Sequence, residues 1–307
     1  MTMLVIATSD KGGTGRSVTS CNVAYRRALQ GSDVCYLDFD FGSPTSGAIF
    51  SIDPVSRGTE GGGLHSYLQG KIAEPQRIDV WRQTDRETLR SRPPGAGRLV
   101  LLPGDQGGGE FSMTKDILQR CTKLFVRLLE EFDLCVVDLS AGRSYAAELV
   151  LAATAQQELR GVPHRWLVFH RWTRQHVIAA SGLVYGRRGL IEAGAERGHD
   201  SQVLADSIRF VRTAVVNPDS EELAGLRPTQ VVWLLDCNKD LQELARQHQL
   251  GRTMVLATIP LDPVLQMREQ LISDRDVWAS QIANAATVAA FDQLARRIAD
   301  DAAWDEL

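Results

Sequence analysis

The sequence predicts an α/β fold with a doubly wound, mainly parallel sheet and helices on both faces. Apolar β-prone segments alternate with helical segments along the chain, and parallel strands require such connections. The segments Met3–Thr8, Val34–Phe39 and Leu134–Val137 are apolar throughout, as in strands buried on both faces. With 307 residues, 44% of them hydrophobic, the chain can bury a core of that size. We expect a single domain over residues 1–307.

The first half of the chain opens with a strand, a glycine-rich loop, a helix and a second strand. Gly31 gives the first helix its natural end, and the predicted helix Thr114–Glu131 keeps one apolar face at helical spacing. In chain order, the predicted elements are the strand Met3–Thr8, the helix Val18–Gln30, the strand Val34–Phe39, a short helix Leu64–Gln69, the strand Arg98–Leu102, the helix Thr114–Glu131 and the strand Leu134–Val137.

The second half continues the alternation. The segment Asp200–Val216 stays ambiguous, because Leu204, Ile208 and Val211 repeat at helical spacing while Phe210–Val216 also fits a strand. The other predicted elements are the strand Trp166–Phe169, the mainly helical Gln175–Ala195, the strand Val231–Leu235, the helix Asp240–Gln247, the strand Met254–Ile259 and a closing helix Ile282–Ala303.

The loop between the first strand and the first helix has the composition of a phosphate-binding loop. It comprises Lys11, Gly12, Gly13, Thr14, Gly15, Arg16 and Ser17. Glycines let the backbone turn tightly and aim N–H groups inward, and the helix N-terminus adds a partial positive charge. The hydroxyl of Ser17 is placed to reach Mg²⁺. The alternative is a glycine-rich turn that holds no ligand.

Carboxylates follow two of the predicted strands. Asp38 and Asp40 come at the end of one strand, and Asp138 ends another. In doubly wound sheets the carboxyl ends of strands line the ligand crevice. We therefore expect Ser17, Asp40 and Asp138 to hold Mg²⁺, with Asp40 orienting an attacking water and Gly142 turning its N–H toward a γ-phosphate. The alternative is that these acids only cap helices or turns.

These motifs together resemble the ParA/MinD family of deviant Walker A ATPases, whose loop reads Lys-Gly-Gly-x-Gly-Lys-Ser/Thr. Lys11–Ser17 matches this loop except that Arg16 stands for the second lysine. The family's other blocks are similar to Leu37–Gly42 (switch I), Leu99–Gly104 (central strand), Val137–Gly142 (Walker B and switch II) and Thr258–Pro263. They occur in family order over residues 3–295, with a less typical segment at about 140–230.

The resemblance implies a SIMIBI-type P-loop fold, binding of ATP or ADP with Mg²⁺, and an ATP-dependent homodimer that positions or regulates a macromolecular partner. Lys11 is then the signature lysine, which in the family reaches the phosphates bound by the partner, and Asp40 activates water. Val18 follows the loop at the phosphate site. Adenine is expected near Asn238, Pro260 and Asp262, with Asn217 as an alternative.

Arg16 is the main departure from the family pattern. Lysine is a compact point charge, whereas arginine is a planar fork that needs more room. We expect nucleotide binding to survive this change and basal hydrolysis to be low. The alternative function is a nucleotide-binding scaffold or sensor with little or no hydrolysis. A metabolic enzyme of the same fold, acting on a small molecule, is a third alternative.

Charge and composition restrict the partners. The net charge is only -4, so any nucleic-acid binding needs a local patch. A stretch without acidic residues after Glu158 contains Arg160, Arg165, Arg171, Arg174, Arg187 and Arg188, which fits non-specific DNA, an unknown protein partner or a merely solvated face. No apolar run spans a membrane and the last residues are acidic, so we expect a cytoplasmic protein without membrane attachment.

Overall fold

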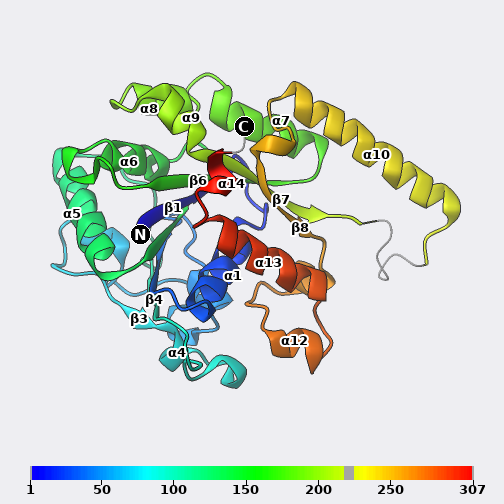
Figure 1. The fold of residues 1–307 in the computed structure, drawn as a ribbon. Coiled ribbons are helices and arrows are strands. Elements are labelled where there is room, and N and C mark those ends of the chain that lie inside the picture. Colours follow the sequence, from blue (N-terminus) through cyan, green and yellow to red (C-terminus); the bar gives the residue numbers. More distant parts are fainter. Residues whose placement is uncertain (1, 218–224, 306–307) are drawn as a thin grey trace.

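The computed structural model describes residues 2–217 and 225–305. In this part of the chain eight strands form one sheet in the order β3-β4-β2-β5-β1-β6-β7-β8 (Figure 1). All neighbours run parallel except β3, which pairs antiparallel with β4. The strands are β1 (Met3–Thr8), β2 (Val34–Phe39), β3 (Ile78–Asp79), β4 (Leu99–Leu102), β5 (Leu134–Leu139), β6 (His164–Arg171), β7 (Ile208–Val215) and β8 (Val255–Pro260). The predicted doubly wound α/β class is confirmed.

Helices cover both faces of the sheet (Figure 1). One face packs against α1 (Arg16–Leu29), α2 (Ser46–Ile49), α4 (Val80–Gln83), α11 (Pro263–Met267), α12 (Asp274–Trp278), α13 (Ala285–Arg297) and α14 (Ala302–Asp305). The other packs against α3 (Leu64–Leu68), α5 (Lys115–Glu131), α6 (Tyr145–Thr154), α7 (Arg174–Tyr185), α8 (Leu190–Ala195), α9 (Ser201–Asp206) and the end of α10 (Pro228–Gln247).

Strand β1 lies at the centre of the sheet, and its side chains alternate between the two cores. Val5 and Ala7 join the core under α1 and α13, whereas Leu4 and Ile6 join the core under α5 and α6. Both sets are apolar because helices exclude water from both faces of a parallel sheet. The uninterrupted apolar strands of the sequence therefore have a direct structural cause.

The strand order brings the carboxyl ends of β1, β2 and β5 together. Strand β1 lies between β5 and β6, and β5 lies between β1 and β2. The register pairs Ala7 with Asp138, and Asp38 also with Asp138. The loop that follows β1 and the acids that end β2 and β5 consequently share one edge of the sheet, where connections of this topology place ligands.

The expected strand Val231–Leu235 is wrong, because these residues belong to the 20-residue helix α10. Pro228 occupies the first turn of the helix, and the side-chain oxygen of Gln230 accepts the backbone N–H of Arg227 at 3.0 Å. A short apolar run has no periodicity of its own that separates a strand from a helix. The ambiguous segment Asp200–Val216 contains both structures, helix α9 and then strand β7.

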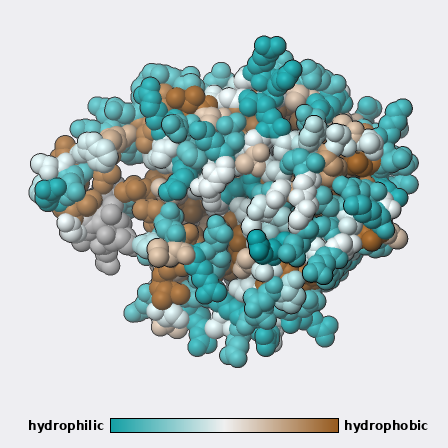
Figure 2. All heavy atoms as spheres, turned by 180° about the vertical axis from the view of Figure 1, so that it is seen from behind, coloured by the Kyte–Doolittle hydropathy of each residue, from teal (hydrophilic) through white to brown (hydrophobic). Residues whose placement is uncertain are grey.

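Helix α10 projects from the body of the molecule (Figure 1) and carries exposed apolar side chains. Val232, Trp233 and Leu235 are exposed on it. Figure 2 shows hydrophobic side chains gathered on this side of the molecule, toward the left of the view. Among the described residues no helix combines the length and the hydrophobicity that crossing a membrane requires.

Candidate functional site

The loop after β1 turns by means of glycines in the left-handed region. Gly13 has a φ of 69° and Gly15 a φ of 73°, where other residues are strained. Gly15 is also the N-cap of α1, and no side chain in the described part of the chain caps this helix start. A Cβ built on Gly12 or Gly13 meets nothing within 4 Å, so the loop borders open space. The geometry is that of an open anion cradle.

A polar contact from β7 holds the loop in place. The hydroxyl of Thr213 donates to the carbonyl of Thr14 at 2.5 Å and also lies 3.2 Å from the carbonyl of His170 on β6. Thr213 is buried. The cradle is thus tied to the carboxyl ends of β6 and β7, on the side of β1 opposite to β5.

A cavity of about 220 Å³ opens beside the cradle. The loop and α1 contribute Gly13, Gly15 and Val18, and the late strands contribute Pro260 and Asp262. The remaining lining includes Arg171, Thr213, Gln266 and Glu269. The structure therefore brings the predicted Pro260 and Asp262 to the cradle, from nearly 250 residues along the chain.

The side chain of Asp262 makes hydrogen bonds within the protein. One carboxylate oxygen accepts the N–H of Val264 at 3.0 Å, as the N-cap of α11. The other accepts the N–H of Asn284 at 3.0 Å and the hydroxyl of Thr287 at 2.7 Å. Both oxygens of this carboxylate are therefore engaged within the protein, and they fix the chain beside the cavity.

Asn238 is not brought to the cavity. It lies on α10, where its side-chain oxygen accepts the indole N–H of Trp172 at 2.8 Å. The indole ring also stacks under the guanidinium of Arg212 at 3.9 Å. Asn238 therefore fixes α10 to the end of β6, and its expected contact with adenine does not follow from the structure.

The side chain of Arg16 turns away from the open cradle toward the two acids. Its Nε lies 2.6 Å from Asp138 Oδ1, and its Nη2 lies 2.9 Å from Asp40 Oδ2. Nη1 and Nη2 also donate to Ser9 Oγ at 3.4 Å and Ser17 Oγ at 3.3 Å. The guanidinium thus contacts every residue that the sequence assigned to Mg²⁺.

Burial and charge act in opposite directions on Arg16. Burial alone lowers the pKa of the guanidinium, but the charges of Asp138 and Asp40 and a hydrogen bond to Asp138 raise it above its ordinary value. The side chains of Arg16 and Asp138 are only 7% and 2% exposed. The guanidinium of Arg16 therefore stays charged at any ordinary pH, and the carboxylate of Asp138, its nearest countercharge, is buried away from water.

Tyr36 completes the surroundings of Asp138. Its hydroxyl donates to Asp138 Oδ2 at 2.9 Å and lies 2.8 Å from Ser20 Oγ. Burial and the charge of Asp138 raise the pKa of the phenol well above its usual value, so Tyr36 stays a hydrogen-bond donor. Both oxygens of Asp138 are engaged by the protein's own side chains.

Magnesium does not fit these residues as they are folded. A Mg²⁺ ion needs oxygens in near-octahedral geometry at short distance. Asp138 is committed to Arg16 and Tyr36, and Asp40 to Arg16 and, through Oδ1, to the N–H of Ser43 at 3.2 Å. Within the described residues no group of three or more His, Cys, Asp or Glu side chains is arranged to hold a metal. The predicted magnesium site of Ser17, Asp40 and Asp138 is occupied by a guanidinium.

Lys11 and Gly142, both predicted to contact phosphates, differ in whether other groups of the protein already engage them. Lys11 is exposed, and in residues 2–217 and 225–305 no ion pair involves it. The N–H of Gly142, expected to reach a γ-phosphate, instead donates to the carbonyl of Ser9 at 2.7 Å. Asp10 lies 3.5 Å from Arg143 Nη1, which offsets its negative charge beside the cradle. Lys11 is thus a cation open to a ligand or partner, whereas Gly142 is engaged.

Arg171 and Thr213 are site residues that sequence reasoning did not place in the nucleotide site. Each lies at the carboxyl end of its strand, β6 and β7, so the rule that selected Asp40 and Asp138 applies to them as well. Thr213 was hidden because the segment containing β7 also fits a helix, and Arg171 because the predicted strand Trp166–Phe169 stops two residues before it. Arg171 Nη2 lies 3.5 Å from Gln266 Oε1, which holds this cation over the cavity.

The arginine-rich stretch does not form one face. Arg165 is buried on β6, where it pairs with Asp301 and lies over the ring of Trp304 at 4.8 Å. Arg160 precedes β6 and Arg171 ends it, so they lie at opposite edges of the sheet. Arg160, Arg174, Arg187 and Arg188 are exposed. Arg165 anchors the end of the chain and is not available to DNA.

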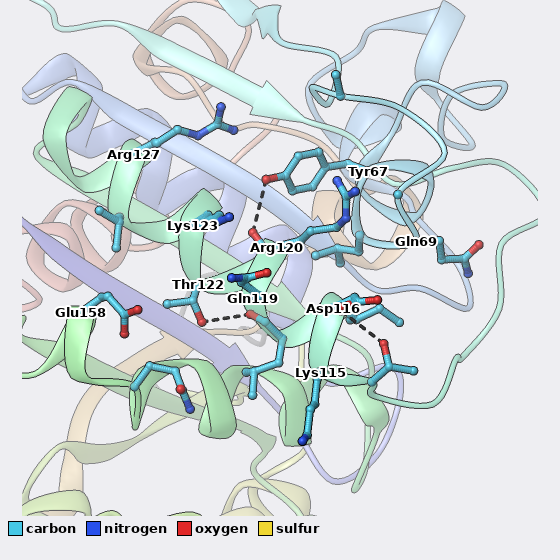
Figure 3. Close-up of a pocket in the computed structure, with 18 of the residues that line it drawn as sticks. Tyr67, Gln69, Lys115, Asp116, Gln119, Arg120, Thr122, Lys123, Arg127 and Glu158 are labelled. Carbon is cyan, nitrogen blue, oxygen red and sulfur yellow. Dashed lines mark hydrogen bonds between the residues drawn. The ribbon is translucent and has the colours of Figure 1, made fainter.

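A second pocket, larger than the cavity beside the cradle, lies elsewhere on the described surface. It is an open groove of about 1530 Å³ along α5 and α3, with residues near η3 (Gln157–Leu159) on its other side (Figure 3). Lys115, Arg120 and Lys123 alternate on it with Glu74 and Glu158, and Tyr67 donates to the carbonyl of Arg120 at 3.3 Å. It contains no residue of the glycine loop and has no consistent charge, so we place the ligand at the loop.

His170, whose carbonyl accepts from Thr213 behind the glycine loop, makes the stability of the protein sensitive to acid. Burial lowers the pKa of its imidazole to about 4, the carbonyl of Arg171 raises it, and the charges of Arg212 and His176 lower it further. The folded protein keeps His170 neutral, whereas the unfolded chain binds a proton below the ordinary value of 6.5. The stability that the neutral ring contributes is therefore present above about pH 6.5 and is lost as the pH falls toward about 4.

We expect His170→Phe to reduce this acid sensitivity. Between about pH 7.5 and about pH 5 the free energy of unfolding of the wild type should fall by about 2 kcal/mol more than that of the variant. Urea denaturation of both proteins at the two pH values measures the difference. Equal losses in the two proteins would show that His170 is protonated in the folded state.

Comparisons with known proteins place this fold. No protein-family model matches the chain, and no curated protein matches it in sequence. Solved structures do match over nearly the whole chain. The septum site-determining protein MinD complexed with Mg-ADP from Pyrococcus horikoshii OT3 is 15% identical, with a TM-score of 0.53 and coverage of 98% of each chain.

Two further solved structures also match over nearly the whole chain. A putative plasmid partition protein from Borrelia burgdorferi B31, bound to AMPPNP, is 13% identical with a TM-score of 0.58, over 96% of this chain and 98% of that one. The pNOB8 ParA bound to nonspecific DNA is 15% identical with a TM-score of 0.53, over 97% and 96%. The protein therefore shares the fold of the MinD and ParA ATPases, the doubly wound P-loop fold that the sequence predicts.

Proposed function

We propose that the protein is a nucleoside-triphosphate-binding switch of the ParA/MinD type, which dimerises on nucleotide and regulates or positions a macromolecular partner. The observation that carries the proposal is the open glycine cradle at the start of α1, with a cavity beside it closed by the ends of β6, β7 and β8. The cradle suits phosphates, because its N–H groups and the helix start favour an anion. The cavity suits the nucleoside.

The matched structures support this ligand. One was solved with Mg-ADP and another with AMPPNP, and both superimpose on nearly the whole chain. At identities of 13–15% these structures share a fold with this protein, which does not by itself imply the same ligand. The support for nucleotide binding is therefore the protein's own loop, in which Gly13 and Gly15 have the left-handed backbone that the cradle requires.

The proposal also includes slow hydrolysis of ATP, or no hydrolysis. Asp40 is the residue expected to activate water, and it is paired with Arg16 at 2.9 Å. One oxygen of this carboxylate accepts from the guanidinium and the other from the N–H of Ser43, so neither is free to orient an attacking water. This observation favours the alternative of a scaffold or sensor that reports nucleotide by its assembly state more than by hydrolysis.

The partner is a second copy of the chain together with a further macromolecule. Among the matched structures are a MinC:MinD complex from Aquifex aeolicus and the ParA bound to nonspecific DNA. The exposed Arg187 and Arg188 are the part of the basic stretch that remains open to DNA phosphates, and such binding weakens steeply with salt. Arg143 lies beside them and donates to the carbonyl of Arg188 at 3.1 Å.

Lys11→Ala is expected to abolish nucleotide-dependent dimerisation. The wild type with a non-hydrolysable ATP analogue should elute as a dimer, because an exposed lysine beside the cradle can reach phosphates held by the other protomer. Size-exclusion chromatography with light scattering measures the mass of each protein with and without the analogue.

Lys71→Ala is the matched control, because Lys71 is also exposed and lies outside the loop and the cavity. It should dimerise like the wild type. A monomer of the wild type with bound analogue, or a dimer that persists in Lys11→Ala, would count against the proposed switch.

A further inference from the structure

The guanidinium of Arg16 contacts the three residues that were expected to bind a divalent metal ion. A divalent cation in a phosphate loop is expected to bridge the loop hydroxyl, the acid at the end of β2 and the acid at the end of β5. The guanidinium contacts all three, with Asp138 at 2.6 Å, Asp40 at 2.9 Å and Ser17 Oγ at 3.3 Å. It supplies the positive charge between the acids.

The shape of arginine matters for this arrangement. Asp138 receives Nε and Asp40 receives Nη2, so two different nitrogens of one rigid, planar group bridge two acids from neighbouring strands. A lysine has a single nitrogen on a flexible stem and cannot present two fixed donors in this way. The geometry therefore explains why arginine, in particular, stands at position 16.

The surrounding groups hold the bridge in place. The hydroxyl of Tyr36 donates to the second oxygen of Asp138, and the N–H of Ser43 donates to the second oxygen of Asp40. The guanidinium is buried, and it cannot lose its proton to ease its removal. An incoming divalent ion would have to displace a buried cation from both acids and find it a new counterion.

We propose that Arg16 is a built-in cation in place of Mg²⁺, so that this protein binds its nucleotide without a divalent metal. This inference rests on the proposed nucleotide site. The charge of the phosphates is met by the N–H groups of the loop, by the exposed Lys11 and by Arg171 at the cavity. The ligand is accordingly a metal-free nucleoside diphosphate or triphosphate.

Isothermal titration of ADP and of a non-hydrolysable ATP analogue, each in excess Mg²⁺ and in EDTA, tests the inference. The affinity of the wild type should differ by less than about threefold between the two buffers. Arg16→Lys should release an acid for the metal, so its affinity should be about tenfold or more higher in Mg²⁺ than in EDTA. Arg16→Gln, which keeps a planar donor without the charge, should gain the same dependence on Mg²⁺ and replaces the lysine variant if that protein does not fold.

Each outcome separates the two proposals. Binding by the wild type that is lost in EDTA overturns the built-in cation and leaves the nucleotide site standing. Binding that ignores Mg²⁺ in the wild type and in both variants also overturns it, because Arg16 is then not the cause. Absence of binding in either buffer overturns the nucleotide site and this inference together.

Discussion

Arg16→Ala is expected to destabilise the protein by about 3–5 kcal/mol, because it leaves a buried carboxylate without its cation. The exposed fraction of the Asp138 side chain is only 2%, so water cannot replace the guanidinium. Among residues 2–217 and 225–305, Tyr36 would remain as the single hydrogen-bond donor to that acid. Urea denaturation at neutral pH measures the loss of unfolding free energy.

Arg98→Ala is the matched control for this prediction. Arg98 also pairs with two acids, Asp33 at 2.9 Å and Glu131 at 3.0 Å, but its side chain is 40% exposed. We expect its removal to cost about 1 kcal/mol or less, as is usual for ion pairs in contact with water. A second variant, Arg16→Ala with Asp138→Asn, should recover part of the stability lost by Arg16→Ala alone. Equal losses in Arg16→Ala and Arg98→Ala would contradict the buried ion pair.

Gly15→Val is expected to weaken nucleotide binding by about 100-fold or more, because several charge-assisted hydrogen bonds from the loop N–H groups are lost together. The φ of 73° at Gly15 is strained for any residue with a Cβ, most of all for a β-branched one. A side chain there also points at Thr213, whose Cβ lies 3.8 Å from the added carbon. Titration with ADP measures the affinity of the wild type and the variant.

Gly161→Val separates the loss of binding from general strain. Gly161 has a φ of 83°, an added Cβ meets nothing within 4 Å, and the residue precedes the amino end of β6, away from the cradle. Both variants should lose about 1–3 kcal/mol of stability from the left-handed backbone. Only Gly15→Val should lose affinity. If both bind ADP like the wild type, the cradle is not the phosphate site.

The sequence predicts the sheet because its signal is local. Each buried strand, such as β1 or β5, is a short apolar run with turn residues at both ends, and the loop after β1 shows its glycines directly. The carboxyl-edge rule then brings Asp40, Asp138 and Pro260 toward that loop. Local patterns and a general rule of topology account for these positions.

The state of Arg16 was not accessible in this way. Arg16 and Asp138 are 122 residues apart, and their contact depends on β5 lying beside β1 in one particular register. The substitution of arginine for lysine is visible in the sequence, but the direction in which the side chain turns is decided by the two acids and Tyr36 together. For the same reason the engaged N–H of Gly142 could not be foreseen.

The wrong prediction of a strand within α10, and the expected role of Asn238, have a different cause. Val231–Leu235 is apolar in sequence yet partly exposed in structure, so the usual link between hydrophobicity and a buried strand does not hold there. The mistaken strand made Asn238 look like a residue at a strand end. In the helix it is a partner of Trp172 instead.

Titration of the wild type with ADP tests the central claim most directly, because a ligand that binds the folded state must release or absorb heat on binding or raise the melting temperature. We predict saturable binding of one ADP per chain, matched by a rise in melting temperature at saturating nucleotide. A protein that shows neither heat of binding nor stabilisation with ADP or with the ATP analogue, in Mg²⁺ and in EDTA, would contradict the assignment of a nucleotide site to the glycine loop.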